Sequence, residues 1–166
     1  MLGSPRFVVD AMLGSLARKL RIFGFDTLYF RDGPDRELER VSREEARVMV
    51  TSDRALAEHA GRHGLVALLV QGRTDRARLV SLLAQARSGG VEVSRGDPRC
   101  AVCNSALERV GPERAARSLP RSIAARHRLY FLCAGCGRLY WRGGHWSRLG
   151  RLSPLFGGRR RRQQPI

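Results

Sequence analysis

Lysine is almost absent from this chain: Lys19 is the single lysine among 31 basic residues, and the other 30 are arginine. Acidic residues are also few, with 15 Asp and Glu in 166 residues, so the formal net charge is +16. No apolar run approaches the roughly 20 residues that cross a bilayer, and residues 1–5 lack the pattern of a secretory signal peptide. We therefore expect a soluble, intracellular and cytoplasmic protein whose partner is a polyanion rather than a membrane.

The shortage of acidic residues is confined to the second half of the chain. Residues 1–94 hold 15 basic and 12 acidic side chains, whereas residues 95–166 hold 16 basic and 3 acidic ones, so the two parts carry about +3 and +13. Arginine donates in a fork that suits phosphate, which favours nucleic acid as the partner. A merely solvated, arginine-rich surface is the alternative. We expect residues 151–166, which contain the run Arg159–Arg162, to form a disordered basic tail.

Cysteine is limited to four residues, arranged as the CxxC pairs Cys100/Cys103 and Cys133/Cys136 with 29 residues between them. Two such pairs supply the four thiolates of a structural Zn²⁺ site and leave no open position for catalysis. Disulfides are the alternative, and they are disfavoured in an intracellular protein. The sequence therefore predicts a zinc-ribbon module over residues 95–150, with a basic insert between the two pairs.

The first part of the chain alternates short apolar runs with segments of helical periodicity. The predicted strands are 6–10, 27–30, 48–51 and 65–70, and the predicted helices are 12–23, 35–47, 53–62 and 75–87. This alternation favours the α/β class, with a mostly parallel sheet and helices on both faces. We assign it to a domain of residues 1–94.

Aspartates recur where the predicted strands end. Asp10, Asp32 and Asp53 each follow a strand, and Asp35 begins the helix after one of these turns. Parallel strands end at one edge of a sheet, where ligands of open α/β folds bind, so the four carboxylates could gather there. Their oxygens suit Mg²⁺ or Mn²⁺, and such ions would support hydrolysis of a phosphodiester. The alternative is that each aspartate only caps its helix.

Taken together, these motifs resemble a known family. The segments that carry the resemblance are Val8–Arg21, Gly24–Leu28, Val50–Arg54, Arg99–Asn104 and Cys133–Trp146. They are similar to the ribonuclease domain found at the carboxyl terminus of Mut-seven exonucleases and in standalone prokaryotic proteins. The resemblance implies a PIN-like fold followed by a zinc ribbon, and RNA as the substrate. It also implies Asp10, Asp35 and Asp53 as ligands of a catalytic Mg²⁺ or Mn²⁺, with Asp32 as a further catalytic candidate.

Four basic side chains are predicted to lie near the acidic edge: Arg18, Lys19, Arg21 and Arg54. We expect them to contact the nucleic-acid backbone, the alternative being that they only solvate outer helix faces. The four histidines show no metal-ligand spacing with the aspartates and are interpreted as surface or packing residues: His59, His63, His127 and His145.

Together with RNA as the substrate that the resemblance implies, these residues predict a divalent-metal-dependent ribonuclease in which a zinc ribbon helps to bind RNA and the acidic edge cuts it. A non-catalytic, nucleic-acid-binding zinc-ribbon protein is the alternative, with aspartates that serve only as caps. A phosphotransferase with Asp10 as nucleophile is disfavoured, because position 12 is Met12 rather than a second aspartate and no glycine-rich phosphate loop with a lysine is present.

Overall fold

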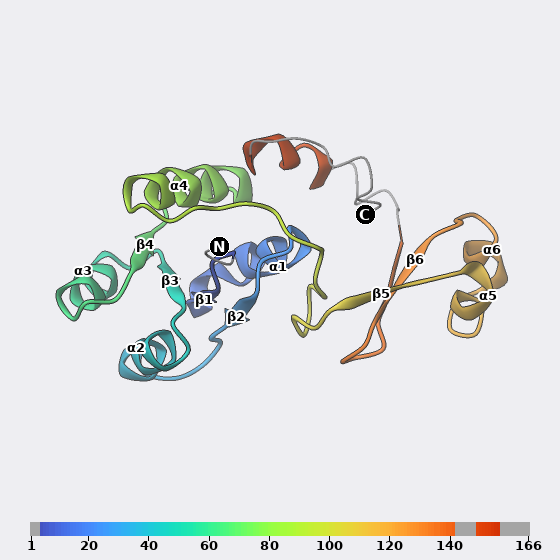
Figure 1. Ribbon diagram of the computed structural model, residues 1–166, viewed down its shortest axis with the longest axis horizontal. Helices are drawn as coiled ribbons and strands as arrows, with labels where there is room; N and C mark the ends of the chain where they lie inside the picture. Colours follow the sequence, from blue (N-terminus) through green and yellow to red (C-terminus); the bar gives the residue numbers. More distant parts are fainter. Residues whose placement is uncertain (1–3, 142–148, 157–166) are drawn as a thin grey trace.

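The computed structural model describes residues 4–141 and 149–156 (Figure 1). Its first part is a four-stranded sheet made of β1 (Phe7–Val9), β2 (Thr27–Tyr29), β3 (Val48–Thr51) and β4 (Ala67–Leu69). All neighbouring strands are parallel, in the order β2-β1-β3-β4. The helices that follow the strands are α1 (Gly14–Ile22), α2 (Asp35–Glu44), α3 (Arg54–Arg62) and α4 (Asp75–Ser88). The predicted α/β class is confirmed. None of the helices in the described ranges is long and apolar enough to cross a membrane.

The sheet is covered by helices on both faces, as predicted. Phe7 and Val9 pack in one apolar cluster with side chains of α1 and α4, while Val8 packs in a second cluster with side chains of α2 and α3. Successive strand residues point to opposite faces, so a central strand with both faces covered must be apolar throughout. All three residues of β1 are fully buried accordingly.

Two helix boundaries differ from the prediction. The first helix begins with a short 3-10 turn, η1 (Ala11–Leu13), before α1. The second helix ends at Glu44 rather than at Arg47, because Ala46 adopts a left-handed backbone conformation with φ of 48°. The Arg47 N–H then donates to the Ser42 carbonyl at 2.9 Å and closes the last turn.

The second part of the chain is a small antiparallel sheet with the order β5-β6-β7. Its strands are β5 (Leu107–Val110), β6 (Tyr130–Cys133) and β7 (Leu139–Trp141), and two one-turn helices, α5 (Pro112–Ala115) and α6 (Arg121–Ala124), lie between β5 and β6 (Figure 1). Its apolar cluster contains Val110, Ala115 and the fully buried Tyr130, with Trp141 packed against them. We call residues 95–141 the cysteine module.

The prediction of a disordered tail from residue 151 is wrong for residues 151–156. Ser153–Phe156 form a 3-10 turn, η2, and both Leu152 and Phe156 are buried in the apolar cluster of α1 and α4. The Phe156 ring centroid lies 4.6 Å from that of Phe23 and 5.6 Å from that of Phe25. The apolar side chains outweigh the basic composition that suggested a tail. Arg159–Arg162 lies outside the described residues.

Candidate active site and metal centre

The strand order creates a topological switch point between β1 and β3. The chain runs from β1 outward to β2 on one side and from β3 outward to β4 on the other. The crevice outside the carboxyl ends of such a strand pair is where open α/β sheets bind ligands. Asp10 directly follows β1, and Asp53 lies two residues beyond the end of β3. Two of the predicted site residues therefore stand at the switch point.

One buried hydroxyl connects these two aspartates. Thr51, the last residue of β3, is fully buried. Its Oγ1 donates to Asp10 Oδ2 at 2.8 Å and accepts from the backbone N–H of Asp53 at 3.0 Å. The Asp10 N–H in turn donates to the Val50 carbonyl at 3.0 Å. The Asp10 carboxylate is thus held in a fixed position relative to the start of α3.

The capping alternative applies to one of the two aspartates but not to the other. Asp53 Oδ1 accepts from the Leu56 N–H at 3.1 Å, so this side chain caps α3 with one of its oxygens. Asp10 precedes η1 without making a side-chain cap bond, although it occupies the cap position. Its carboxylate is half-buried and is oriented by Thr51 instead.

Asp35 and Asp32 are farther out on the segment that follows β2. Asp35 is the first residue of α2, makes no cap bond, and is exposed, as is Asp32 in the preceding turn. Among the residues that the structure describes, the aspartates do not form a group whose ligand oxygens all lie within 4.8 Å of one another. Asp10 and Asp53 are thus linked through Thr51, whereas Asp32 and Asp35 are not drawn into that link.

A fifth carboxylate at this edge, Asp75, was not predicted as a site residue. Asp75 begins α4, and its Oδ2 lies 2.6 Å from Lys19 Nζ and accepts from Ser15 Oγ at 3.1 Å. Burial would raise the pKa of Asp75, but hydrogen bonds and charge from Lys19, with help from Ser15, outweigh it and hold the pKa below the usual range. Lys19 therefore ties α1 to α4. The signal was present in the sequence, because Asp75 also follows a strand and a turn.

The other basic candidates differ in exposure. Arg18 on α1 and Arg54 at the start of α3 are exposed, and Arg54 directly follows Asp53. Arg21, in contrast, is only 6% exposed. Two of the four predicted nucleic-acid contacts therefore present an exposed guanidinium, and Arg21 has a different environment.

Arg21 joins the α/β domain to the cysteine module. Its Nε donates to the Thr27 carbonyl at 2.8 Å, and its Nη1 donates to the carbonyls of Ala101 at 3.1 Å and Val102 at 2.8 Å. These two carbonyls belong to the Cys100–Cys103 turn. Burial lowers the pKa of Arg21 from its ordinary value, while the neighbouring thiols act in the opposite direction. A guanidinium keeps its charge under such a shift, so a positive charge lies beside the cysteines.

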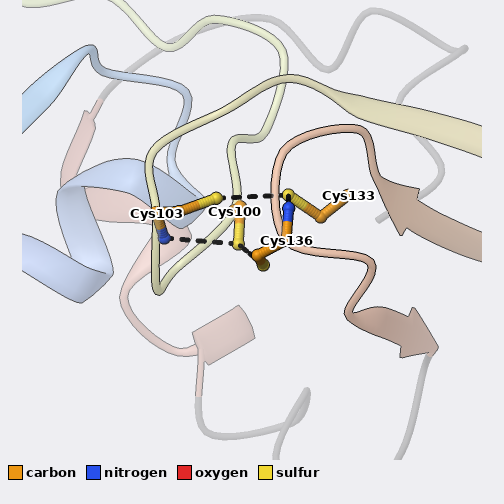
Figure 2. A group of neighbouring side chains, drawn as sticks. All are labelled: Cys100, Cys103, Cys133 and Cys136. Atoms are coloured by element: carbon orange, nitrogen blue, oxygen red, sulfur yellow. Dashed lines mark hydrogen bonds between the residues drawn. The ribbon is translucent and has the colours of Figure 1, made fainter.

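The four cysteines converge from two separate turns (Figure 2). Cys100 and Cys103 precede β5, whereas Cys133 ends β6 and Cys136 lies in the turn before β7. The Sγ atoms are 3.6 Å apart for Cys100 and Cys136 and 3.3 Å apart for Cys103 and Cys133, and all four lie within 4.8 Å of one another. All four thiols are free. The group could hold a tetrahedral metal ion such as zinc, because four cysteine thiolates are a ligand set that structural zinc sites use.

The two cysteine turns have the same local geometry. In each, the backbone N–H of the second cysteine donates to the sulfur of the first, Cys103 to Cys100 at 3.5 Å and Cys136 to Cys133 at 3.4 Å. In each, the next residue has a left-handed backbone, Asn104 with φ of 67° and Gly137 with φ of 70°. The CxxC spacing therefore produces two turns that present sulfur pairs ready to bind a cation.

The pKa values of the thiols indicate which of them would have to lose a proton when a metal ion binds. Hydrogen bonds with Ser105 lower the pKa of Cys103 to about 6, whereas burial raises that of Cys133 to about 12. Zinc ligation requires all four thiolates, so binding would release a proton from Cys133 at neutral pH.

Asn104 anchors the first cysteine turn at the amino end of β2. Its Nδ2 donates to Asp26 Oδ1 at 2.8 Å, and its Oδ1 accepts from the Thr27 N–H at 3.1 Å. Arg47 Nη1 also donates to Asp26 Oδ1, at 2.8 Å. Burial would raise the pKa of Asp26, but these bonds from Arg47 and Asn104 outweigh it and lower the pKa. The cysteine module is thus docked at the amino-terminal edge of the sheet, opposite the edge where the strands end.

Fold and site together define an α/β protein with carboxylates at a topological switch point and a docked four-cysteine module. A family model described as the Mut7-C RNAse domain matches residues 5–153. The match covers most of the chain, so the chain belongs to the Mut7-C RNAse domain family, as the motifs predicted. No curated protein and no solved structure matches the chain. Membership of this family points to a nuclease with a nucleic-acid substrate.

Proposed function

We propose that this chain is a divalent-metal-dependent ribonuclease that hydrolyses RNA phosphodiester bonds at the carboxyl edge of its parallel sheet. The single observation that carries the proposal is the link from Asp10 through Thr51 to Asp53 at the switch point between β1 and β3. The Thr51 hydroxyl fixes the Asp10 carboxylate relative to the Asp53 backbone, and Asp10 makes no cap bond, so helix capping does not explain its position. A carboxylate fixed in this way is what a site for a cation would need.

The donor set fits Mg²⁺ or Mn²⁺, because hard carboxylate oxygens come from two adjacent strands. Asp10 and Asp53 would hold the ion, with Asp35 and Asp32 as further candidates from the segment after β2. A bound ion of this kind supplies an activated water and stabilises the leaving oxygen. Thr51 orients Asp10, and the Asp53 cap fixes the start of α3. The exposed Arg54 beside Asp53, and Arg18 on α1, would hold the phosphate backbone.

We further propose that the cysteine module binds one structural Zn²⁺ and assists RNA binding. Four thiolates and Zn²⁺ carry a charge of about −2, and the buried Arg21 at the Cys100–Cys103 turn offsets part of it. The strong positive charge of residues 95–166 favours polyanions. Because the cysteine turns dock at the opposite edge of the sheet, RNA that contacts both parts must extend across a face of the domain.

A non-catalytic RNA-binding protein is the second candidate. Two observations favour it: Asp53 caps α3, and the aspartates do not form a tight oxygen cluster among the described residues. In that case the basic module would bind RNA and the carboxyl edge would have no chemical role.

The test is cleavage of a labelled single-stranded RNA by the purified full chain with Mn²⁺ or Mg²⁺, with and without EDTA. We expect cleavage that needs the metal and that is lost in Asp10→Asn. The matched control is Asp97→Asn, since Asp97 is an exposed aspartate in the cysteine module and should leave cleavage unchanged. RNA binding without cleavage under either metal would favour the second candidate.

A further inference from the structure

A second group of metal-ligand types lies between α2 and α3, outside both sites described above. Glu39 of α2 and His59 of α3, together with His63 just after α3, have ligand atoms that all lie within 4.8 Å of one another. The two histidines are four residues apart, a spacing that places side chains on the same face of a helix. Their ring centroids are 4.2 Å apart, and His59 Nε2 lies 3.4 Å from Glu39 Oε1.

The hydrogen bonds around the group leave suitable atoms free for a cation. His63 Nδ1 lies 2.9 Å from the His59 carbonyl. A carbonyl only accepts, so Nδ1 carries the proton and Nε2 of His63 is left with its lone pair. This bond from the other ring nitrogen to a carbonyl is the outer contact that usually orients a metal-binding histidine. The Glu39 side chain is 15% exposed and lies against α3, whereas the His59 side chain is 50% exposed. The group is therefore open to solvent on one side.

We propose that Glu39, His59 and His63 form a second metal site, for a borderline divalent transition metal such as Zn²⁺. Two imidazoles and one carboxylate are a three-ligand set that zinc accepts with water in the fourth position, whereas Mg²⁺ prefers oxygen ligands. Arg43 brings a positive charge beside the group, because its Nη2 donates to the His63 carbonyl at 3.3 Å. This bond holds the guanidinium on the carbonyl. An ion at the site would join α2, which begins with Asp35, to α3, which Asp53 caps.

The competing interpretation is an ordinary ion pair between His59 and Glu39 with His63 stacked beside it. The two interpretations differ in the number of metal ions that the chain binds. With one Zn²⁺ in the cysteine group, as proposed above, the second site requires a further Zn²⁺ that depends on histidine and not on thiolate.

The experiment is a titration of the full chain, with the cysteine group already loaded with Zn²⁺, by further Zn²⁺ in competition with a chromophoric chelator. We expect one additional equivalent in the wild type. We expect affinity for it to fall by ~100-fold or more in His59→Gln and in His63→Gln, because outer-shell contacts alone are worth 10–100-fold. The matched control His127→Gln removes a histidine of the cysteine module and should keep the additional equivalent.

A parallel titration with Co²⁺ identifies the ligands. The cysteine group should give thiolate-to-cobalt charge-transfer bands, and the additional equivalent should bind without increasing them. The proposal is overturned if the wild type takes up no additional Zn²⁺, or if a His59→Gln/His63→Gln double variant still does so with wild-type affinity. Far-ultraviolet circular dichroism of each variant checks that the fold is intact.

Discussion

At the scale of single residues, the sequence predicts where residues in local motifs lie. It does not predict hydrogen bonds between residues that are far apart in the chain. The positions of Asp10 and Asp53 at the carboxyl edge could be predicted because each follows an apolar strand, and the convergence of the cysteines because their CxxC spacing is local. The position of Asp75 after a strand and a turn was visible in the sequence, but its bonds to Lys19 and to Ser15, which is 60 residues away, were not. Arg21 was expected to contact nucleic acid, yet two of its acceptor carbonyls, those of Ala101 and Val102, are 80 and 81 residues away in the cysteine module.

The most informative single residue is Thr51. In Thr51→Val the volume is kept, but the Asp10 carboxylate and the Asp53 N–H lose their shared partner. We expect the free energy of unfolding to fall by about 1–3 kcal/mol and RNA cleavage to fall further than this loss of folded protein explains. Urea unfolding and cleavage rates measured on the same preparation test this. Thr51→Ser keeps the hydroxyl and should restore both, so equal cleavage by Thr51→Val and the wild type would contradict the orienting role.

At the scale of elements, the α/β alternation was predictable because both periodicities are strong, and all four strands and four helices of the first domain are present. The end of α2 was not predictable, because nothing in the sequence indicates that Ala46 adopts a left-handed backbone conformation with φ of 48°. The turn η2 was missed for a different reason. The basic residues around it dominate the local composition and suggested a tail. Leu152 and Phe156 nevertheless pack in the apolar core of the first domain, whose other residues lie much earlier in the sequence.

Truncating Phe156 tests whether η2 belongs to the core of the first domain. Phe156→Ala removes a ring that packs on Phe23 and Phe25, and we expect it to lower the free energy of unfolding by about 3 kcal/mol. Val80→Ala is the control, since Val80 on α4 is 47% exposed and should change stability by less than about 0.5 kcal/mol. Urea denaturation measures both. Equal stability of the two variants would mean that η2 adds nothing to the core.

At the scale of the whole molecule, the cysteine module and the α/β domain are joined by polar contacts that Arg21 makes with the first cysteine turn and that Asn104 makes with the start of β2. Sequence patterns predicted both parts but not the contact between them. In the sequence, Asn104 is simply the residue after the first CxxC pair and Asp26 the residue before a strand, and nothing indicates that their side chains bond to each other. The structure shows that Asn104 bonds to Asp26 and to the Thr27 N–H, and that Arg47 shares the same carboxylate.

This contact should make stability depend on pH in the acid range. The pKa of Asp26 is lowered in the folded state, so its contribution is fully present above the unfolded-state pKa of about 3.9 and is lost as the pH falls through the lower folded-state value. Asp26→Asn should therefore lower the free energy of unfolding by about 1–3 kcal/mol at pH 7 and show a shallower loss of stability than the wild type as the pH falls below about 4. Urea unfolding across this range provides the measurement. If the free energy of unfolding depends on pH with the same slope in both proteins, Asp26 does not contribute to the acid sensitivity.

Removing the proposed Zn²⁺ from the cysteine group should weaken the α/β domain as well. The Ala101 and Val102 carbonyls that bind Arg21 lie inside the first cysteine turn. A chelator under reducing conditions would remove the ion that fixes this turn, and the two hydrogen bonds to Arg21 should then weaken. We expect faster hydrogen exchange at the Thr27 amide, which bonds to Asn104, and a lower melting temperature of the domain. The Leu13 amide, bonded to the Asp10 carbonyl at the far edge, serves as the internal control. Unchanged exchange at Thr27 would show that the docking is independent of the metal.

The central claim, that the carboxyl edge at Asp10 and Asp53 cleaves RNA, is tested most directly with Asp53→Asn. Asparagine caps a helix as well as aspartate does, so the α3 start should persist while the negative charge is lost. Single-turnover cleavage of labelled RNA with Mn²⁺ should slow by at least ~100-fold, with RNA affinity and melting temperature close to those of the wild type. Cleavage at the wild-type rate by a folded Asp53→Asn protein would contradict the account.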